Sequence, residues 1–125
     1  MREIKFRGKC AFSGAWRYGY YYPSKGNHII RDDEDKETMV MPNTVGQYTG
    51  LKDKNGVEIY EGDCVKYDNG DTGKVVFRFG QFYAYNGYAR DSVEAEMKLY
   101  DDSAPFDDGF EIEIIGNIHD NPELL

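Results

Sequence analysis

The chain has 125 residues, of which 40% are hydrophobic and 15% aromatic, and its formal net charge at pH 7 is −8. This length corresponds to about one domain, which can bury about two-thirds of its unfolded surface without metals or disulfides. An acidic surface repels phosphates, so the net charge disfavours a nucleic-acid partner. No stretch approaches the ~18 apolar residues of a membrane span, and the N-terminus lacks an apolar signal core. We therefore expect a cytoplasmic protein without a membrane segment.

The charge is unevenly distributed along the chain. Residues 1–30 contain six basic residues and one acidic residue, a formal charge of +5, which leaves −13 for the remainder. A basic arm on an acidic body can pair within the chain or with a second copy, so a homo-oligomer is plausible, or it can contact nucleic acid. The two cysteines, Cys10 and Cys64, lie in strand-like patterns, which favours two buried thiols over a disulfide.

The N-terminal residues alternate in the manner of a half-buried β-strand. Ile4 and Phe6 alternate with charged residues, and a Ser-Gly turn signal follows. In the next segment, A-W-R-Y-G-Y-Y-Y, the same period places Trp16, Tyr18 and Tyr20 on one face. We expect this face to be core, with Tyr21 outside, and the two strands to form a hairpin before a short third strand at 28–30.

An acidic run, R-D-D-E-D-K-E, occupies residues 31–37. Such a run is usually a solvated loop. A calcium loop would need acids at alternate positions and a glycine at its tight turn, and here the acids are consecutive. No metal is expected there.

Turn residues recur at short intervals between Val45 and Tyr67. Asn55-Gly56 is a strong hairpin signal and predicts a type I′ turn, in which both central residues have positive φ. Gly62 then breaks the return strand, because glycine adopts backbone conformations that a side chain disfavours. The regular spacing is therefore explained by tight turns in a β-meander and does not require a chemical site.

The last third of the chain has a weaker pattern. Residues 73–85 predict two strands that break near Gly80, and E-I-E-I-I-G-N-I predicts a final strand. Residues 91–100 fit either a short helix capped by Ser92 or a strand with alternating apolar residues; the helix is favoured slightly. About eight short strands with turns every 8–12 residues predict an all-β fold, mainly β with at most one short helix, as a barrel or sandwich.

Few residues carry an enzymatic pattern. His28 and His119 are isolated from other zinc ligands, and no phosphate-binding or serine-hydrolase motif occurs. Glu58, Glu61 and Asp63 lie close in sequence and could bind a metal in an enzyme acting on nucleotides. The preferred interpretation is that Glu58 faces solvent and the other two cap a turn. We expect no enzyme, and no catalytic, cofactor-binding or metal-binding residues.

Two groups of side chains are candidates for an interaction surface. Interleaved basic and aromatic residues in the N-terminal hairpin would suit single-stranded nucleic acid, although only one aromatic is expected to be exposed. The acidic groups would suit a basic protein partner. The candidates are Lys5, Arg7, Lys9, Arg17, Tyr21, Asp32, Asp33, Glu34, Asp35, Asp101 and Asp102.

Several motifs together resemble one family. These are I-K-F-R-G-K, W-R-Y-G, the long run from Pro42 to Asp63 and the tail I-I-G-N-I-H-D-N-P-E-L-L. The chain resembles the YopX family of phage and prophage proteins. The positions read as structural are Gly46, Gln47, Tyr48, Thr49, Gly50, Leu51, Asp53, Asn55, Gly56, Ile59, Tyr60, Glu61, Gly62, Asp63, Gly116 and Asn117.

The resemblance implies a small SH3-like barrel and no established activity. We expect residues 1–40 to form an N-terminal β region and residues 41–125 the barrel region, within one compact unit. The predicted function is a non-enzymatic binding module for a host or phage protein in the host cytoplasm. Nucleic-acid binding through the basic hairpin is the alternative, and a carboxylate-dependent enzyme is less favoured.

Overall fold

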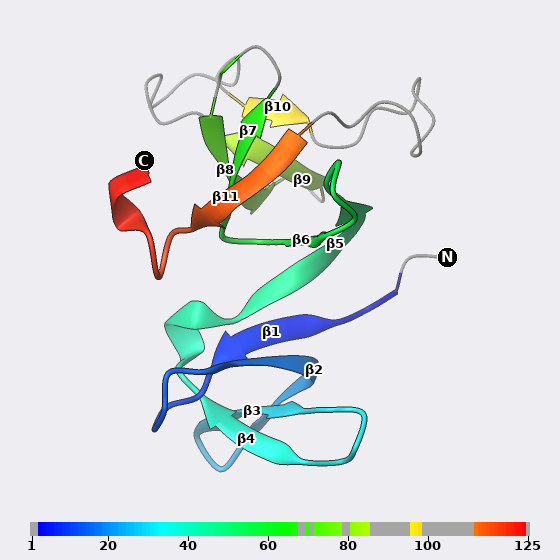
Figure 1. Ribbon diagram of the computed structural model, residues 1–125. Helices are drawn as coiled ribbons and strands as arrows, with labels where there is room; N and C mark the ends of the chain where they lie inside the picture. Colours follow the sequence, from blue (N-terminus) through cyan, green and yellow to red (C-terminus); the bar gives the residue numbers. More distant parts are fainter. Residues whose placement is uncertain are drawn as a thin grey trace. The chain divides into compact units, whose positions relative to one another are not determined.

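The computed structural model describes residues 3–67, 70, 72–78, 81–85, 96–98 and 112–124. The chain divides into two compact units, Met1–Gly50 and Leu51–Leu125, and each is described by itself. Its regular structure is β-strand with short 3-10 turns (Figure 1). The prediction of an all-β chain is therefore confirmed. In the described part of the chain, no helix has the length and apolar character needed to cross a lipid bilayer.

The first unit is built on antiparallel strands in the order β4-β3-β2-β1-β5. Strand β5 continues into the second unit, and β6 follows it in the sheet order. Strand β4 was not predicted, because it begins at the last residue of the acidic run and has only four residues. The elements are β1 (Phe6–Lys9), β2 (Trp16–Ser24), β3 (Asn27–Arg31), β4 (Glu37–Val40), the 3-10 helix η1 (Pro42–Thr44) and β5 (Gly46–Lys52).

The core of the first unit lies where β4 meets the end of β1. Ile30 and Val40 are almost fully buried. Gly8 faces Val40 so closely that an added Cβ would lie 3.0 Å from the valine side chain. Cys10 forms a β-bridge with Val40, and the Met41 amide donates to the Lys9 carbonyl at 2.9 Å. These contacts cover the outer edge of β4 and protect it from pairing with another chain.

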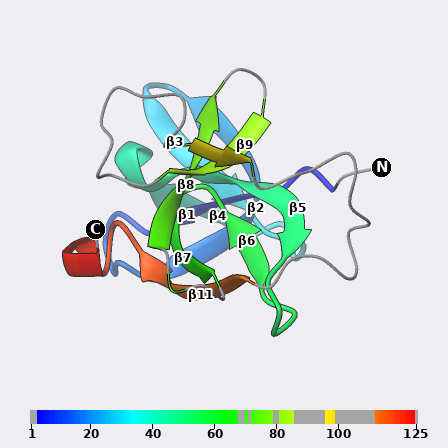
Figure 2. The ribbon, with the colours of Figure 1, turned by 90° about the horizontal axis from the view of Figure 1, so that it is seen from above.

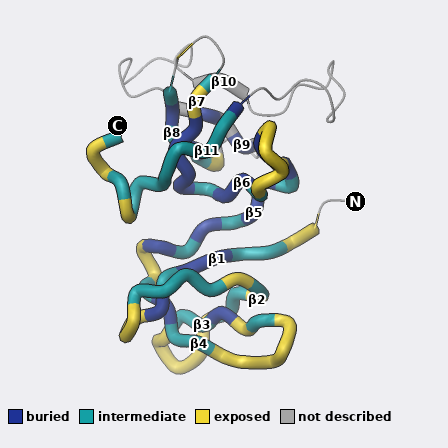
Figure 3. The backbone as a smooth tube through the Cα atoms, in the orientation of Figure 1, coloured by how far each residue is buried: buried dark blue, intermediate teal, exposed yellow. Residues whose placement is uncertain are grey.

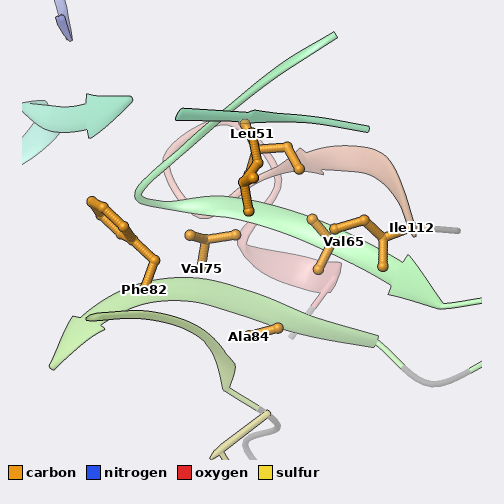
Figure 4. Packing of buried hydrophobic residues seen from close by; sticks show 7 residues of the cluster. Leu51, Val65, Val75, Phe82, Ala84 and Ile112 are labelled. Carbon is orange, nitrogen blue, oxygen red and sulfur yellow. The ribbon is translucent and has the colours of Figure 1, made fainter. Parts of the chain in front are cut away.

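The second unit contains an antiparallel sheet in the order β10-β9-β8-β7-β11, and β7 lies between β8 and β11 (Figure 2). Its core combines apolar residues of this sheet, several of them labelled in Figure 4, with one residue each from β5 and β6: Leu51, Ile59, Val65, Val75, Phe82, Ala84 and Ile112. The elements are β6 (Glu58–Tyr60), β7 (Asp63–Tyr67), β8 (Thr72–Arg78), β9 (Gln81–Tyr85), β10 (Glu96–Lys98), β11 (Ile112–Asn117) and the 3-10 helix η3 (Pro122–Leu124).

Two sequence predictions need correction in this unit. Among the described residues the strands form open antiparallel sheets, so an SH3-like barrel is not confirmed. Within the segment 91–100, residues 96–98 form strand β10, and the helix is wrong there; the other positions lie outside the described residues. Met97 pairs with Ala84 between β10 and β9. The apolar pattern of this segment fitted a helix and a strand equally, and pairing with β9 favours the strand.

The hairpin at Asn55-Gly56 is confirmed, but its turn is not type I′. Gly56 has φ of 81°, whereas among the described residues only Lys25 and Asp35 are non-glycine positions with positive φ. The turn is instead organised by Asp53, whose carboxylate oxygen Oδ1 accepts hydrogen bonds from the amides of Asn55 (2.8 Å) and Val57 (2.9 Å). Hydrogen bonds to the Asp53 side chain therefore hold this turn, and Asn55 does not have the positive φ that the sequence pattern implied.

Candidate functional site

Cross-strand register in the first unit brings basic and aromatic side chains to one face of the sheet. Lys9 pairs with Trp16 and Arg7 with Tyr18 between β1 and β2. Tyr20 pairs with Arg31 between β2 and β3. Because directly paired residues project to the same side, these side chains share a face.

The cations on this face lie against the aromatic rings. The Arg7 guanidinium is 4.5 Å from the Trp16 ring centroid, and the Lys9 ammonium is 5.7 Å from the same ring. The Arg31 guanidinium is 6.0 Å from each of the Tyr20 and Tyr22 ring centroids. These distances fall within the range of cation–π attraction. Since Arg7 itself is buried, it is part of the packing rather than an open contact site.

The outward and inward faces of β2 are the reverse of the sequence prediction. Tyr18 and Tyr20 are 45% and 63% exposed, so the prediction that they are core is wrong. Tyr21, predicted to face out, contacts Phe6 at a ring-centroid distance of 5.5 Å, and its hydroxyl lies 2.5 Å from His28 Nδ1. The segment has aromatic residues on both faces, so its alternation could not show which face meets the core. Ile30, paired with Tyr21, places the apolar core on that side.

The outward face contains a hollow of about 340 Å³, which we call the tyrosine hollow. It is lined by Glu3, Ile4, Lys5, Tyr18, Gly19, Tyr20, Arg31 and Asp33. Its apolar surface comes from two exposed tyrosine rings and from Ile4, which is 64% exposed. The charged side chains in its lining comprise two acids and two bases, so their formal charges cancel.

Backbone geometry at Gly19 shapes this hollow. Gly19 has φ of 155°, and an added Cβ would lie 2.0 Å from the Arg31 carbonyl oxygen. Glycine therefore allows β2 and β3 to approach closely at this point. The approach keeps Tyr18, Tyr20 and Arg31 around one concavity.

The predicted basic candidates are not equivalent in the structure. Lys5 pairs with Glu3 at 3.7 Å and lies 5.4 Å from the Tyr48 ring centroid. Arg17 lies outside the hollow lining, and its guanidinium donates to the Trp16 carbonyl at 3.2 Å. Of the predicted surface residues that the structure describes, only Lys5 and Asp33 line the tyrosine hollow. Sequence reasoning missed Arg31, Tyr18 and Tyr20, although their alternation with charged residues was visible.

The acidic run forms the turn between β3 and β4, which Figure 3 shows as mostly exposed chain. Asp32 Oδ1 accepts hydrogen bonds from the amides of Glu34 and Lys36, both at 2.9 Å. Asp33, Glu34 and Asp35 are exposed. The acidic candidates Asp101 and Asp102 lie outside the described residues.

The three carboxylates considered for a metal-dependent enzyme do not converge. Asp63 is buried, and its Oδ2 accepts from the Tyr60 amide at 2.7 Å. Glu58 Oε1 accepts from the Tyr60 hydroxyl at 3.3 Å. Among the described residues, which include all three, no group of three or more potential ligands could hold a metal ion. Asp63 therefore holds the turn after β6, as the turn interpretation expected, whereas Glu58, expected to face solvent, is half-buried.

The central motif organises the second unit through Asp53. Its Oδ1 holds the turn that follows β5, and its Oδ2 accepts from the Ile114 amide at 3.1 Å. The Lys54 amide also donates to the Ile112 carbonyl at 3.0 Å. One buried carboxylate thus joins the hairpin to β11, which explains its place in the motif structurally.

The C-terminal motif also has a structural role. Asn117 Oδ1 accepts hydrogen bonds from the amides of His119 (3.0 Å) and Asp120 (2.9 Å). At Gly116, an added Cβ would lie 2.6 Å from the Asn121 side chain. This tight turn requires a glycine followed by a short acceptor side chain.

Both cysteines are free and buried, as predicted. Hydrogen bonding to the Ser13 side chain, and to the backbone of Ser13 and Phe12, lowers the pKa of the Cys10 thiol to about 7. Burial raises the pKa of the Cys64 thiol. The two thiols therefore differ in chemical character.

Fold and site define a small all-β protein with an aromatic and basic sheet face. The family model described as YopX protein matches residues 5–125, so the chain belongs to the YopX family. The crystal structure of protein EF1440 from Enterococcus faecalis is similar, with a TM-score of 0.56 and 24% sequence identity. That similarity covers 100% of this chain and 99% of EF1440, and it shows the fold alone. Among curated proteins, none matches the chain.

Proposed function

We propose that the chain is a non-enzymatic binding module that docks a protein partner in the tyrosine hollow. The observation that carries this proposal is the clustering of exposed apolar surface. The large hydrophobic residues exposed in the described part of the chain are Ile4, Phe12, Tyr18, Tyr20, Val57 and Phe77, and half of them line this one concavity. Contiguous exposed apolar surface with a polar rim is typical of interaction sites.

The residue types in the hollow also fit a protein partner. Tyrosine and arginine are over-represented among the residues that dominate binding energy at protein interfaces. The formal charges of the lining cancel, as is common in a rim that meets a mixed protein surface. The expected partner is a host or phage protein, and the expected location is the cytoplasm.

Single-stranded nucleic acid is the second candidate, supported by the alternation of cations and rings across the sheet face. Lys9 and Arg31 each lie beside an aromatic side chain, an arrangement that suits stacked bases and phosphates. The neutral lining of the hollow and the net charge of −8 weigh against it. We therefore rank it second.

A capture experiment with matched variants tests the proposal. The tagged chain, Tyr20→Ala and Phe12→Ala are each used to capture proteins from a host lysate with and without nuclease. Phe12 is an 85% exposed aromatic that does not line the hollow, so it controls for loss of surface hydrophobicity. We expect a nuclease-resistant protein that the unaltered chain and Phe12→Ala retain and that Tyr20→Ala loses by about fivefold or more.

Other outcomes of this experiment count against the proposal. Equal capture by all three chains would mean that the hollow does not bind the captured protein. Capture that nuclease abolishes would promote the nucleic-acid candidate.

A further inference from the structure

Resting on the proposed function, we infer that Arg31 anchors a carboxylate of the partner. The occupant is an extended protein segment in which one acidic side chain stands next to apolar ones. The apolar side chains lie on Tyr18 and Tyr20, and the carboxylate meets the Arg31 guanidinium. This assignment follows from the position of Arg31, from its available donors and from the charges around it.

Two aromatic rings on the neighbouring strand lie within cation–π range of Arg31. Its guanidinium lies 6.0 Å from the Tyr20 and Tyr22 ring centroids. The Tyr22 hydroxyl hydrogen-bonds to Glu37, a contact that raises the pKa of Tyr22 and fixes its ring beside β4. The planar guanidinium is itself pre-organised, so arginine loses less freedom for each hydrogen bond that it makes to a ligand.

The hydrogen-bond donors of Arg31 are available to a ligand. In the described part of the chain, its guanidinium has neither a hydrogen-bond nor an ion-pair partner, whereas Lys5 pairs with Glu3. Arginine presents its N–H groups in a planar fork that matches a carboxylate through two parallel hydrogen bonds. The side chain also lines the tyrosine hollow, so a ligand seated on the rings can reach it.

The neighbouring acids favour a single carboxylate over a chain of phosphates. Asp33 lines the same hollow two residues after Arg31, and Glu3 lines it beside Lys5. One negative group can meet Arg31, but a second one would approach Asp33, Glu3 or Glu37, the last of which pairs with Arg31 between β3 and β4. Such like-charge contacts exclude wrong partners. A hollow of about 340 Å³ is at the lower end of ligand-site volumes, enough for a few side chains.

Two capped five-residue peptides test the inference by isothermal titration calorimetry. In one, glutamate stands between leucine and phenylalanine; in the other, glutamine replaces the glutamate. We expect the unaltered chain to bind the glutamate peptide about tenfold more tightly, the preference expected of a charge-assisted pair. Arg31→Gln should abolish that preference, and Asp33→Asn should increase it. Arg17→Gln, at an arginine outside the hollow, should leave it unchanged.

The outcomes separate this inference from the proposed function. Equal binding of both peptides that still depends on Tyr20 would overturn the role of Arg31 and leave the docking site intact. A preference for the glutamate peptide that weakens in Asp33→Asn would mean that Asp33 does not repel the peptide carboxylate, which overturns the charge argument of the inference. Failure of both peptides to bind also overturns it. A fifteen-residue oligothymidylate that binds through Arg31 would identify nucleic acid as the ligand. Far-ultraviolet circular dichroism of each variant confirms folding.

Discussion

Removal of the Asp53 carboxylate should cost the second unit more stability than any exposed acidic substitution. Asp53 is 7% exposed and accepts three backbone hydrogen bonds, from Asn55, Val57 and Ile114. Hydrogen bonds to a charged group contribute about 1.5–3 kcal/mol each, and such contributions do not add fully. Water can reach the two turn amides after truncation, because Asn55 and its neighbours are exposed. We therefore expect Asp53→Ala to lower the free energy of unfolding by about 3–4 kcal/mol.

The substitution Asp53→Asn refines this expectation. An amide keeps one oxygen for the turn but turns an N–H toward the Ile114 amide, so we expect a loss of about 2 kcal/mol. Urea unfolding followed by far-ultraviolet circular dichroism measures both values, with hydrogen exchange at the Val57 and Ile114 amides as a local readout. Asp33→Asn, at an exposed position, should change stability by less than about 0.5 kcal/mol. The reasoning is refuted if Asp53→Ala unfolds within about 0.5 kcal/mol of the unaltered chain.

Three further predictions follow from the local geometry. Gly19→Ala should destabilise the first unit by about 2 kcal/mol or more, since its Cβ would meet the Arg31 carbonyl; unchanged Trp16 fluorescence and urea midpoint would contradict this. Burial raises the pKa of Tyr67 to about 12, and its buried hydroxyl has no hydrogen-bond partner among the described residues. Tyr67→Phe should therefore leave the free energy of unfolding unchanged or raise it by about 1 kcal/mol, and a loss above 2 kcal/mol would be inconsistent. Iodoacetamide labelling, read by mass spectrometry, should modify Cys10 at a rate that rises with the thiolate fraction and reaches half its maximum near pH 7. Cys64 should not react at that pH. A midpoint above about pH 8.5 for the labelling rate of Cys10 would argue against the hydrogen bonds to Ser13.

The sequence predicted the fold class where turn chemistry and alternation agreed. Gly62 has φ of 95°, as its place between β6 and β7 suggested, and the Asn55-Gly56 hairpin is present. The type I′ turn was wrong because the Asn55-Gly56 signal takes no account of Asp53, two residues before Asn55, whose carboxylate accepts a hydrogen bond from the Asn55 amide. Strand β10 was missed because Met97 fits a helix and a strand equally by period, and only its partner Ala84 separates the two.

The candidate site was predicted less well than the fold. The sequence placed Trp16, Tyr18 and Tyr20 on one face correctly, but it could not tell which face meets the core. That choice depends on two buried residues. Ile30 lies on β3, which pairs with β2, and Val40 forms a bridge with Cys10 directly after β1. Arg31 meets Tyr20 through the β2–β3 hairpin, whose turn residues Lys25 and Gly26 both have positive φ. Sequence reasoning placed these residues in a polar loop and therefore did not derive the register that forms the hollow.

The most direct test of the docking site is photocrosslinking from inside the tyrosine hollow. p-Benzoylphenylalanine replaces Tyr20 in one chain and Phe12 in another, and each is irradiated in host lysate. The proposed docking site predicts a discrete crosslinked protein from position 20, absent from position 12 and reduced by the Arg31→Gln substitution. Crosslinking from position 12 alone, or the same products from both positions, would contradict it.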